Sequence, residues 1–147
     1  MLFDRVLVLV RGGGDLASGV VYRLHRAGFP VMITELAVPL LVRRAVCFGE
    51  AMITGMITIE DITARRVAAS ADVRPTIDRG EIPVLCDPDG DSITELRPMV
   101  IVDARMEKRS LDTRIDDAPL VIALGPGYSA GENCHAVIET NRGHWLG

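Results

Sequence analysis

Near its N-terminus the sequence contains the stretch Val6-Leu-Val-Leu-Val-Arg-Gly-Gly-Gly-Asp-Leu-Ala17, in which an apolar, β-branched run and one arginine lead into three glycines. A continuous apolar run of this kind is typical of a strand buried on both faces of a sheet, so we predict a central strand over Val6–Val10. Apolar residues then recur at helical spacing from Asp15 to Ala27, and Gly28 ends that helix. A second strand over Val31–Thr34 completes a βαβ unit of about 30 residues.

The rest of the chain predicts further strands and helices in one layered α/β domain. Apolar runs predict buried strands, the last of them at a sheet edge, over Ile82–Cys86, Val100–Val102, Leu120–Leu124 and His135–Glu139. Proline placement and helical spacing predict helices over Pro39–Phe48, Ala69–Arg79 and Ile93–Leu96. Alternating β-branched and polar residues over Met56–Ala68 predict a hairpin. We therefore expect a single doubly wound α/β domain over residues 1–147, with a mostly parallel sheet and a β-hairpin insertion.

Composition limits the function classes and the compartment. The net charge is −4 and no run of like charges stands out, which argues against a nucleic acid or an anionic membrane as partner. The N-terminus lacks the pattern of a signal peptide, and no segment approaches the ~18 apolar residues of a membrane span. Cys47, Cys86 and Cys134 are odd in number and widely spaced, which favours reduced thiols in a cytoplasmic protein.

The first glycine turn carries the pattern G-x-G-x-x-A at Gly12, Gly14 and Ala17, with Gly13 and Leu16 inside it. The first small residue allows a tight turn, the second lets the backbone approach a pyrophosphate, and the third lets the helix pack closely on the strand. The helix N-terminus then offers free N–H groups and a positive dipole end to the anion. Because the pattern follows a predicted strand and opens a predicted helix, it favours a nucleotide or cofactor site.

Acidic and basic residues near this turn bear on the same prediction. Glu35 ends the second predicted strand, 21 positions after Gly14, which is the usual distance for a carboxylate that binds a ribose hydroxyl. Asp15 would repel a phosphate but would be ordinary as an N-cap. Arg43 and Arg44 could reach a phosphate or lie on a solvated face. The alternative is a tight structural turn with an incidental acid.

A second glycine turn, Gly125–Gly131, follows another buried strand and is expected at the same edge of the sheet. Its G-x-S-x-G pattern resembles a hydrolase elbow, but Pro126 and Gly127 separate the strand from Ser129, and only 18 residues remain for an acid and a histidine. We therefore expect Gly125, Gly127 and Ser129 to cover the ligand, with Ser129 as a hydrogen-bond donor. A plain surface loop is the alternative.

Three further features of the sequence give weaker signals for a binding or metal site. The charged set Asp103, Arg105, Lys108 and Arg109 follows a predicted strand, at the end where ligands bind in open α/β sheets. Cys86 is interpreted as a core thiol. We expect no metal site, because the sequence has neither C-x-x-C nor H-x-x-x-H spacing.

A set of short motifs spans nearly the whole chain in a specific order. They are Val10-Arg-Gly-Gly-Gly-Asp-Leu-Ala-Ser-Gly19, Tyr22-Arg-Leu-His-Arg-Ala-Gly28, Arg43-Arg-Ala-Val46, Glu81-Ile-Pro-Val84, Val102-Asp-Ala-Arg-Met106, Ala118-Pro-Leu-Val-Ile122 with Gly125-Pro-Gly127, and His135-Ala-Val-Ile-Glu-Thr-Asn-Arg-Gly-His144. In these motifs the chain resembles the selenium-dependent molybdenum hydroxylase accessory proteins, a family related to the xanthine dehydrogenase accessory proteins. The family's first turn usually reads G-A-G, and Gly12-Gly-Gly14 keeps its small residues.

The resemblance implies a Rossmann-like protein that helps to mature or insert the molybdenum cofactor of a hydroxylase. We expect a small nucleotide-containing ligand, with molybdopterin dinucleotide and NAD(P) as candidates, and a molybdenum hydroxylase apoenzyme as partner. An NAD(P)-dependent oxidoreductase, which Glu35 would favour, and a non-enzymatic ligand-sensing module are the alternatives. The residues assign no catalytic group, and they leave open whether copies of the chain form a homo-oligomer.

Overall fold

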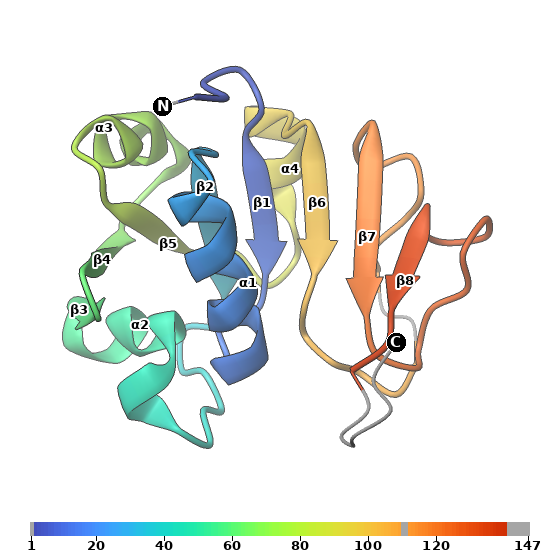
Figure 1. Cartoon of the computed structure of the whole chain (residues 1–147), viewed down its shortest axis with the longest axis horizontal. Coiled ribbons are helices and arrows are strands. Elements are labelled where there is room, and N and C mark those ends of the chain that lie inside the picture. The colour runs from blue at the N-terminus through green and yellow to red at the C-terminus, as the bar shows by residue number, and fades with distance from the viewer. Residues whose placement is uncertain (1, 110–111, 141–147) are drawn as a thin grey trace.

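A single mixed sheet forms the centre of the molecule (Figure 1). The computed structural model describes residues 2–109 and 112–140, and within them eight strands follow the order β3-β4-β5-β2-β1-β6-β7-β8. Their bounds are β1 (Val8–Arg11), β2 (Val31–Glu35), β3 (Met56–Ile59), β4 (Ile62–Val67), β5 (Ile82–Cys86), β6 (Val100–Asp103), β7 (Leu120–Leu124) and β8 (Ala136–Ile138). Neighbouring strands pair in parallel except for the β3–β4 hairpin.

Helices lie on both faces of this sheet, so the fold is doubly wound. Their bounds are α1 (Asp15–Arg26), α2 (Ala51–Thr54), α3 (Val73–Asp78) and α4 (Asp91–Leu96), with 3-10 turns η1 (Arg44–Val46), η2 (Phe48–Glu50) and η3 (Ser70–Asp72). One face packs against α1, η2 and α2, and the other against α3 and α4. In β1, Val8 and Val10 enter the first core and Leu9 the second, which is why this strand reads as a continuous apolar run.

The direction of strand addition reverses between β1 and β6. From β1 the chain adds β2, the β3–β4 hairpin and β5 on one side, and after α4 it adds β6, β7 and β8 on the other. In Figure 1 the carboxyl ends of β1, β6 and β7 meet at the lower edge of the sheet. Ligands of open α/β proteins bind outside the carboxyl ends of strands at such a reversal.

The structure confirms the predicted α/β class, the mostly parallel sheet and the hairpin insertion. The edge strand predicted over His135–Glu139 is β8 (Ala136–Ile138). Residues 141–147, which include the end of the last family-like motif, lie outside the described part of the chain. That the whole of 1–147 forms one domain stays a prediction.

The helix predicted over Pro39–Phe48 is wrong. The chain instead runs without regular structure to η1, and then through η2 into α2. At the end of this segment two backbone donors serve tertiary contacts: Phe48 N–H donates to Ser18 Oγ at 2.8 Å, and Gly49 N–H, one residue further on, donates to the Gly13 carbonyl at 2.9 Å. Amides used in this way cannot also make the hydrogen bonds of a helix.

Two smaller predictions also differ from the structure. The first strand is Val8–Arg11 rather than Val6–Val10, so Arg11 belongs to the sheet and is only 2% exposed. Cys86 was expected in the core but is exposed, because it is the last residue of β5. Within the described residues no helix is both long enough and apolar enough to span a membrane.

Candidate functional site

The first glycine turn, Gly12–Gly14, joins β1 to α1 at the reversal point. Gly12 has a φ of +96°, and a Cβ there would lie 3.3 Å from the backbone of Ala104, which follows β6. Gly14 is the N-cap of α1, and a Cβ there would meet no described heavy atom within 4 Å. The turn is therefore closed beneath Gly12 and open beside Gly14, at the N-terminal end of a helix whose first backbone N–H groups have no partner in the helical hydrogen-bond ladder.

The middle glycine of the turn contacts a second glycine from far along the chain. A Cβ on Gly13 would lie 2.6 Å from Gly49 Cα, and a Cβ on Gly49 would lie 2.8 Å from the Gly13 carbonyl oxygen. Ser18 Oγ also donates to that carbonyl at 3.3 Å. The segment after η1 is thereby fastened directly to the glycine turn, an arrangement that only glycine permits at both positions.

Glu35, at the end of β2, reaches the same turn. Its Oε2 accepts a hydrogen bond from Gly13 N–H at 2.8 Å, and its Oε1 accepts one from Leu36 N–H at 2.7 Å. The carboxylate thus lies beside the turn, from the strand end at which the sequence placed Glu35. Each oxygen has a further lone pair, so both keep the capacity to accept a hydroxyl from a ligand.

Asp15 is the first residue of α1 rather than its cap. Its Oδ1 accepts the Leu16 N–H at 3.0 Å, and its Oδ2 pairs with Arg43. The Arg43 hydrogen bond outweighs partial burial and lowers the pKa of Asp15 below its ordinary value. The negative charge that would oppose a phosphate is therefore partly neutralised. Arg44 is directed elsewhere and forms a two-point ion pair with Glu50.

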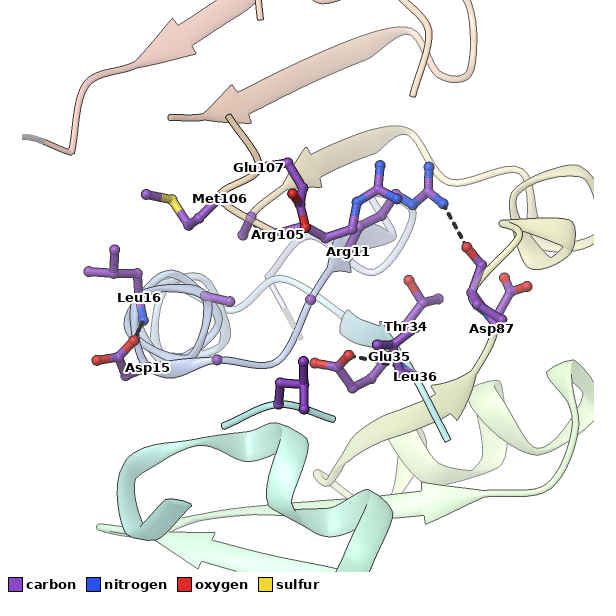
Figure 2. A pocket seen from close by; sticks show the side chains of 16 residues that line it. Arg11, Asp15, Leu16, Thr34, Glu35, Leu36, Asp87, Arg105, Met106 and Glu107 are labelled. Atoms are coloured by element: carbon purple, nitrogen blue, oxygen red, sulfur yellow. Dashed lines mark hydrogen bonds between the residues drawn. The ribbon is translucent and has the colours of Figure 1, made fainter. Parts of the chain in front are cut away.

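These elements enclose a pocket of about 450 Å³, whose lining side chains Figure 2 shows. The lining comes from the ends of β1, β2, β5 and β6 and from the first turn of α1. It comprises Arg11, Gly12, Gly14, Asp15, Leu16, Ala17, Thr34, Glu35, Leu36, Leu40, Asp87, Pro88, Ala104, Arg105, Met106 and Glu107. Gly13, which contacts Glu35 and Gly49, lies behind this surface. The pocket occupies the position that the strand order predicts for a ligand site.

A buried polar cluster lies beside this pocket, centred on Asp103 at the end of β6. Asp103 is fully buried, and its carboxylate accepts hydrogen bonds from Arg105, from Thr113 Oγ1 at 2.5 Å and from Tyr128 Oη at 2.5 Å. Burial opposes the charge, but these donors together lower the pKa of Asp103 below its ordinary value. Burial and the bond to Asp103 raise the pKa of Tyr128 to about 12. The carboxylate is therefore held ionised and the phenol neutral.

Arg11 and Arg105 extend side by side toward one end of the pocket (Figure 2). Arg11 donates to Thr113 Oγ1 at 2.8 Å, to the Pro88 carbonyl at 3.4 Å and to Asp112 Oδ2 at 2.8 Å. Arg105 donates to the other oxygen of Asp112, also at 2.8 Å. One carboxylate therefore bridges two guanidinium groups, and these donors lower the pKa of Asp112 despite its partial burial.

The second glycine turn lies at the same sheet edge but does not line this pocket. Gly125 packs against Met106, and a Cβ on Gly127 would lie 2.7 Å from the Glu107 carbonyl oxygen. Ser129 is exposed, and its backbone N–H donates to Asn133 Oδ1 at 2.9 Å, just after the turn. The turn thus supports a loop that borders the pocket. Direct contact of Gly125, Gly127 or Ser129 with a ligand stays a prediction.

Sequence reasoning found part of the cluster and missed part of it. Asp103 and Arg105 were singled out because they follow a strand, whereas Lys108 and Arg109 are exposed and do not line the pocket. Thr113 and Tyr128 were missed, since a threonine and a tyrosine in irregular segments carry no local signal. Their partners lie 10 and 25 positions away along the chain.

The comparisons with known proteins identify one curated relative. The chain is 51% identical over 141 residues to a protein of Escherichia coli (strain K12) whose name is "Uncharacterized protein YqeB". The alignment covers 96% of this chain and 26% of that protein, so the chain spans about a quarter of the length of the relative it matches. No family model matches the chain, and no solved structure matches it.

Metal-ligating side chains do not gather into a site in the described part of the chain. Within it, no group of three or more histidine, cysteine, aspartate or glutamate side chains is placed to hold a metal ion. The three cysteines, Cys47, Cys86 and Cys134, are free thiols. The arrangement at the pocket is instead suited to binding an anion, through helix N–H groups on one side and arginines on the other.

Proposed function

We propose that this pocket binds a nucleotide-containing ligand. The observation that carries the proposal is the open space beside Gly14, where a helix of 12 residues begins inside a pocket at the strand-order reversal. The phosphates would lie against the first turn of α1, and the ribose would lie toward Glu35. The closed side of the turn at Gly12 and Gly13 fixes the backbone that the phosphates approach.

The biological role that we propose is assistance in maturing a molybdenum hydroxylase. Its support is the ordered set of motifs, which resemble the selenium-dependent molybdenum hydroxylase accessory proteins over nearly the whole chain. The ligand would then be a molybdopterin dinucleotide, and the partner the hydroxylase apoenzyme. The free thiols support a cytoplasmic setting for this role.

Native mass spectrometry of the purified chain tests both parts of the proposal. A co-purifying mass equal to a pterin dinucleotide is the expected result. A nicotinamide dinucleotide would favour the oxidoreductase alternative instead. If nothing co-purifies, calorimetric titration with NAD, molybdopterin dinucleotide and ADP decides whether a nucleotide binds at all, and no measurable binding of any of them would refute the proposal.

A matched pair of variants locates the binding. Gly14→Val places a branched side chain where the phosphates must approach, and we expect it to abolish binding. Gly19→Val makes the same substitution on the exposed side of α1, outside the pocket lining, and we expect it to bind as the wild type does. Equal binding by the two variants would show that the ligand lies elsewhere.

A further inference from the structure

The two arginines at the end of the pocket differ in how their charge is balanced. Arg105 contacts the buried Asp103 and also Asp112, whereas the carboxylate that Arg11 contacts is Asp112. The Arg11 side chain is 2% exposed, so its charge is removed from water almost completely. A buried guanidinium needs an anion beside it, because an uncompensated buried charge is strongly destabilising.

The anion that fills this role is the most accessible member of the cluster. Asp103 is fully buried, Thr113 is 2% exposed and Arg105 is 19% exposed, whereas the Asp112 side chain is 46% exposed. Asp103 also receives hydrogen bonds from three side chains, while Asp112 is bound by the two arginines. Asp112 is therefore the carboxylate that another anion could replace while Asp103 stays in place.

The Thr113 hydroxyl already has its full set of partners. It donates its proton to Asp103, and its oxygen accepts from Arg11 at 2.8 Å and from Arg105 at 3.0 Å. Thr113 thus holds both guanidinium groups in position independently of Asp112. What remains when Asp112 leaves is a pair of arginines at the pocket lining, fixed in place and carrying one charge more than Asp103 neutralises.

We propose that Arg11 and Arg105 form an oxyanion site in which Asp112 is a displaceable internal occupant. The ligand group that takes its place is a phosphate or a carboxylate. Either of these groups carries two oxygens on one central atom, as the Asp112 carboxyl does, and can offer one oxygen to each arginine. The inference deepens the proposed function, since this oxyanion would be a second anionic group of the ligand held at the first glycine turn. Exchange of Asp112 for a carboxylate or a phosphodiester, each with one negative charge, leaves the charge of the cluster unchanged.

Inorganic phosphate is the probe that tests this site, with acetate as the carboxylate probe. We expect Asp112→Asn to bind phosphate more than about tenfold more tightly than the wild type, because charge-assisted hydrogen bonds become available to the probe. Asp116→Asn removes the same charge from an exposed position on the same connection, and we expect it to bind as the wild type does. Calorimetry in chloride buffer measures the affinities, and a difference between phosphate and acetate shows which oxyanion the site prefers.

Two double variants separate this inference from the proposed function. Arg11→Met with Asp112→Asn removes both charges, so it should fold and should lose phosphate binding. Gly14→Val with Asp112→Asn should retain phosphate binding, even if it no longer binds a nucleotide. Loss of phosphate binding in that variant would place the anion at the glycine turn, which would overturn this inference and support the proposed function.

The remaining outcomes are equally decisive. Equal phosphate affinity of Asp112→Asn and the wild type would overturn the inference. If Asp112→Asn is unfolded in chloride, the inference requires phosphate to restore its circular dichroism spectrum. A variant that stays unfolded in saturating phosphate would show that an external anion cannot replace the carboxylate.

Discussion

Replacing Gly13 by alanine tests the contact that fastens the glycine turn. The added Cβ would lie 2.6 Å from Gly49 Cα and 2.8 Å from Gly49 N, so the two backbones would have to move apart. The φ angle of Gly13 is not positive, so alanine suits its backbone conformation and the conflict is steric. The segment that would move carries η2 and α2, which pack on one face of the sheet.

The expected loss of stability follows from three contributions. Overpacking of this kind costs about 1–3 kcal/mol. Separating the backbones would also break the 2.9 Å hydrogen bond from Gly49 N–H to the Gly13 carbonyl, which is worth about 1 kcal/mol. Alanine restricts the unfolded chain and returns about 0.4–1 kcal/mol. We therefore expect Gly13→Ala to lower the free energy of unfolding by about 1–4 kcal/mol.

Gly14→Ala is the matched control. Gly14 has a φ of −68° and open space around it, so we expect its free energy of unfolding to stay within about 0.5 kcal/mol of the wild type. Urea denaturation followed by circular dichroism measures the difference, which should move the midpoint by about 1 M. Equal midpoints for the two variants would refute the argument that the Gly13–Gly49 contact is rigid.

Three further predictions concern the ligand, the chemistry and the pH dependence. If Glu35 accepts hydrogen bonds from a ribose, NAD should bind more tightly than NADP in calorimetry, because the extra phosphate of NADP would face a carboxylate. Equal affinities would mean that Glu35 accepts hydrogen bonds from the protein backbone and not from the ligand. We expect no NAD(P)H formation with a panel of alcohols and hydroxy acids, since the described residues that line the pocket include no histidine, tyrosine or lysine to move a proton. Turnover of any substrate in the panel would support the oxidoreductase alternative. In the Tyr22→Phe variant, tyrosinate absorbance should report Tyr128 alone and rise with a midpoint near pH 12 rather than 10. Because this pKa is raised in the folded state, the stability that Tyr128 contributes is fully present below pH 10 and is lost as the pH rises toward 12, and a midpoint at 10 would contradict the buried bond to Asp103.

The sequence predicted the elements whose signals are local. The run Val6–Val10 and the glycines after it predicted β1, the first turn and α1, because a strand buried on both faces is apolar at every position. The position of Glu35 beside the turn was also predictable, since it follows from the length of one βαβ unit. These features depend on residues within about 30 positions of one another.

What the sequence could not show depends on partners that are distant in the chain. Arg11 was predicted to follow the first strand, but it is the last residue of β1, and its guanidinium is fixed by Thr113, 102 positions away. The segment Pro39–Phe48 reads as a helix, but at its end the amides of Phe48 and Gly49 donate to Ser18 and Gly13. In both cases a tertiary hydrogen bond decides the local structure, and no periodicity in the sequence reports it.

The hydrogen bond between Gly13 and Glu35 has a spectroscopic consequence. It confines a single glycine amide proton between a carboxylate and the backbone of a second glycine, so that proton should exchange with solvent far more slowly than those of nearby loop residues. A ligand whose hydroxyls donate hydrogen bonds to the same carboxylate would directly change the chemical shift of that amide proton. Occupancy of the pocket could then be followed in solution at one backbone position, by nuclear magnetic resonance and without any label on the ligand.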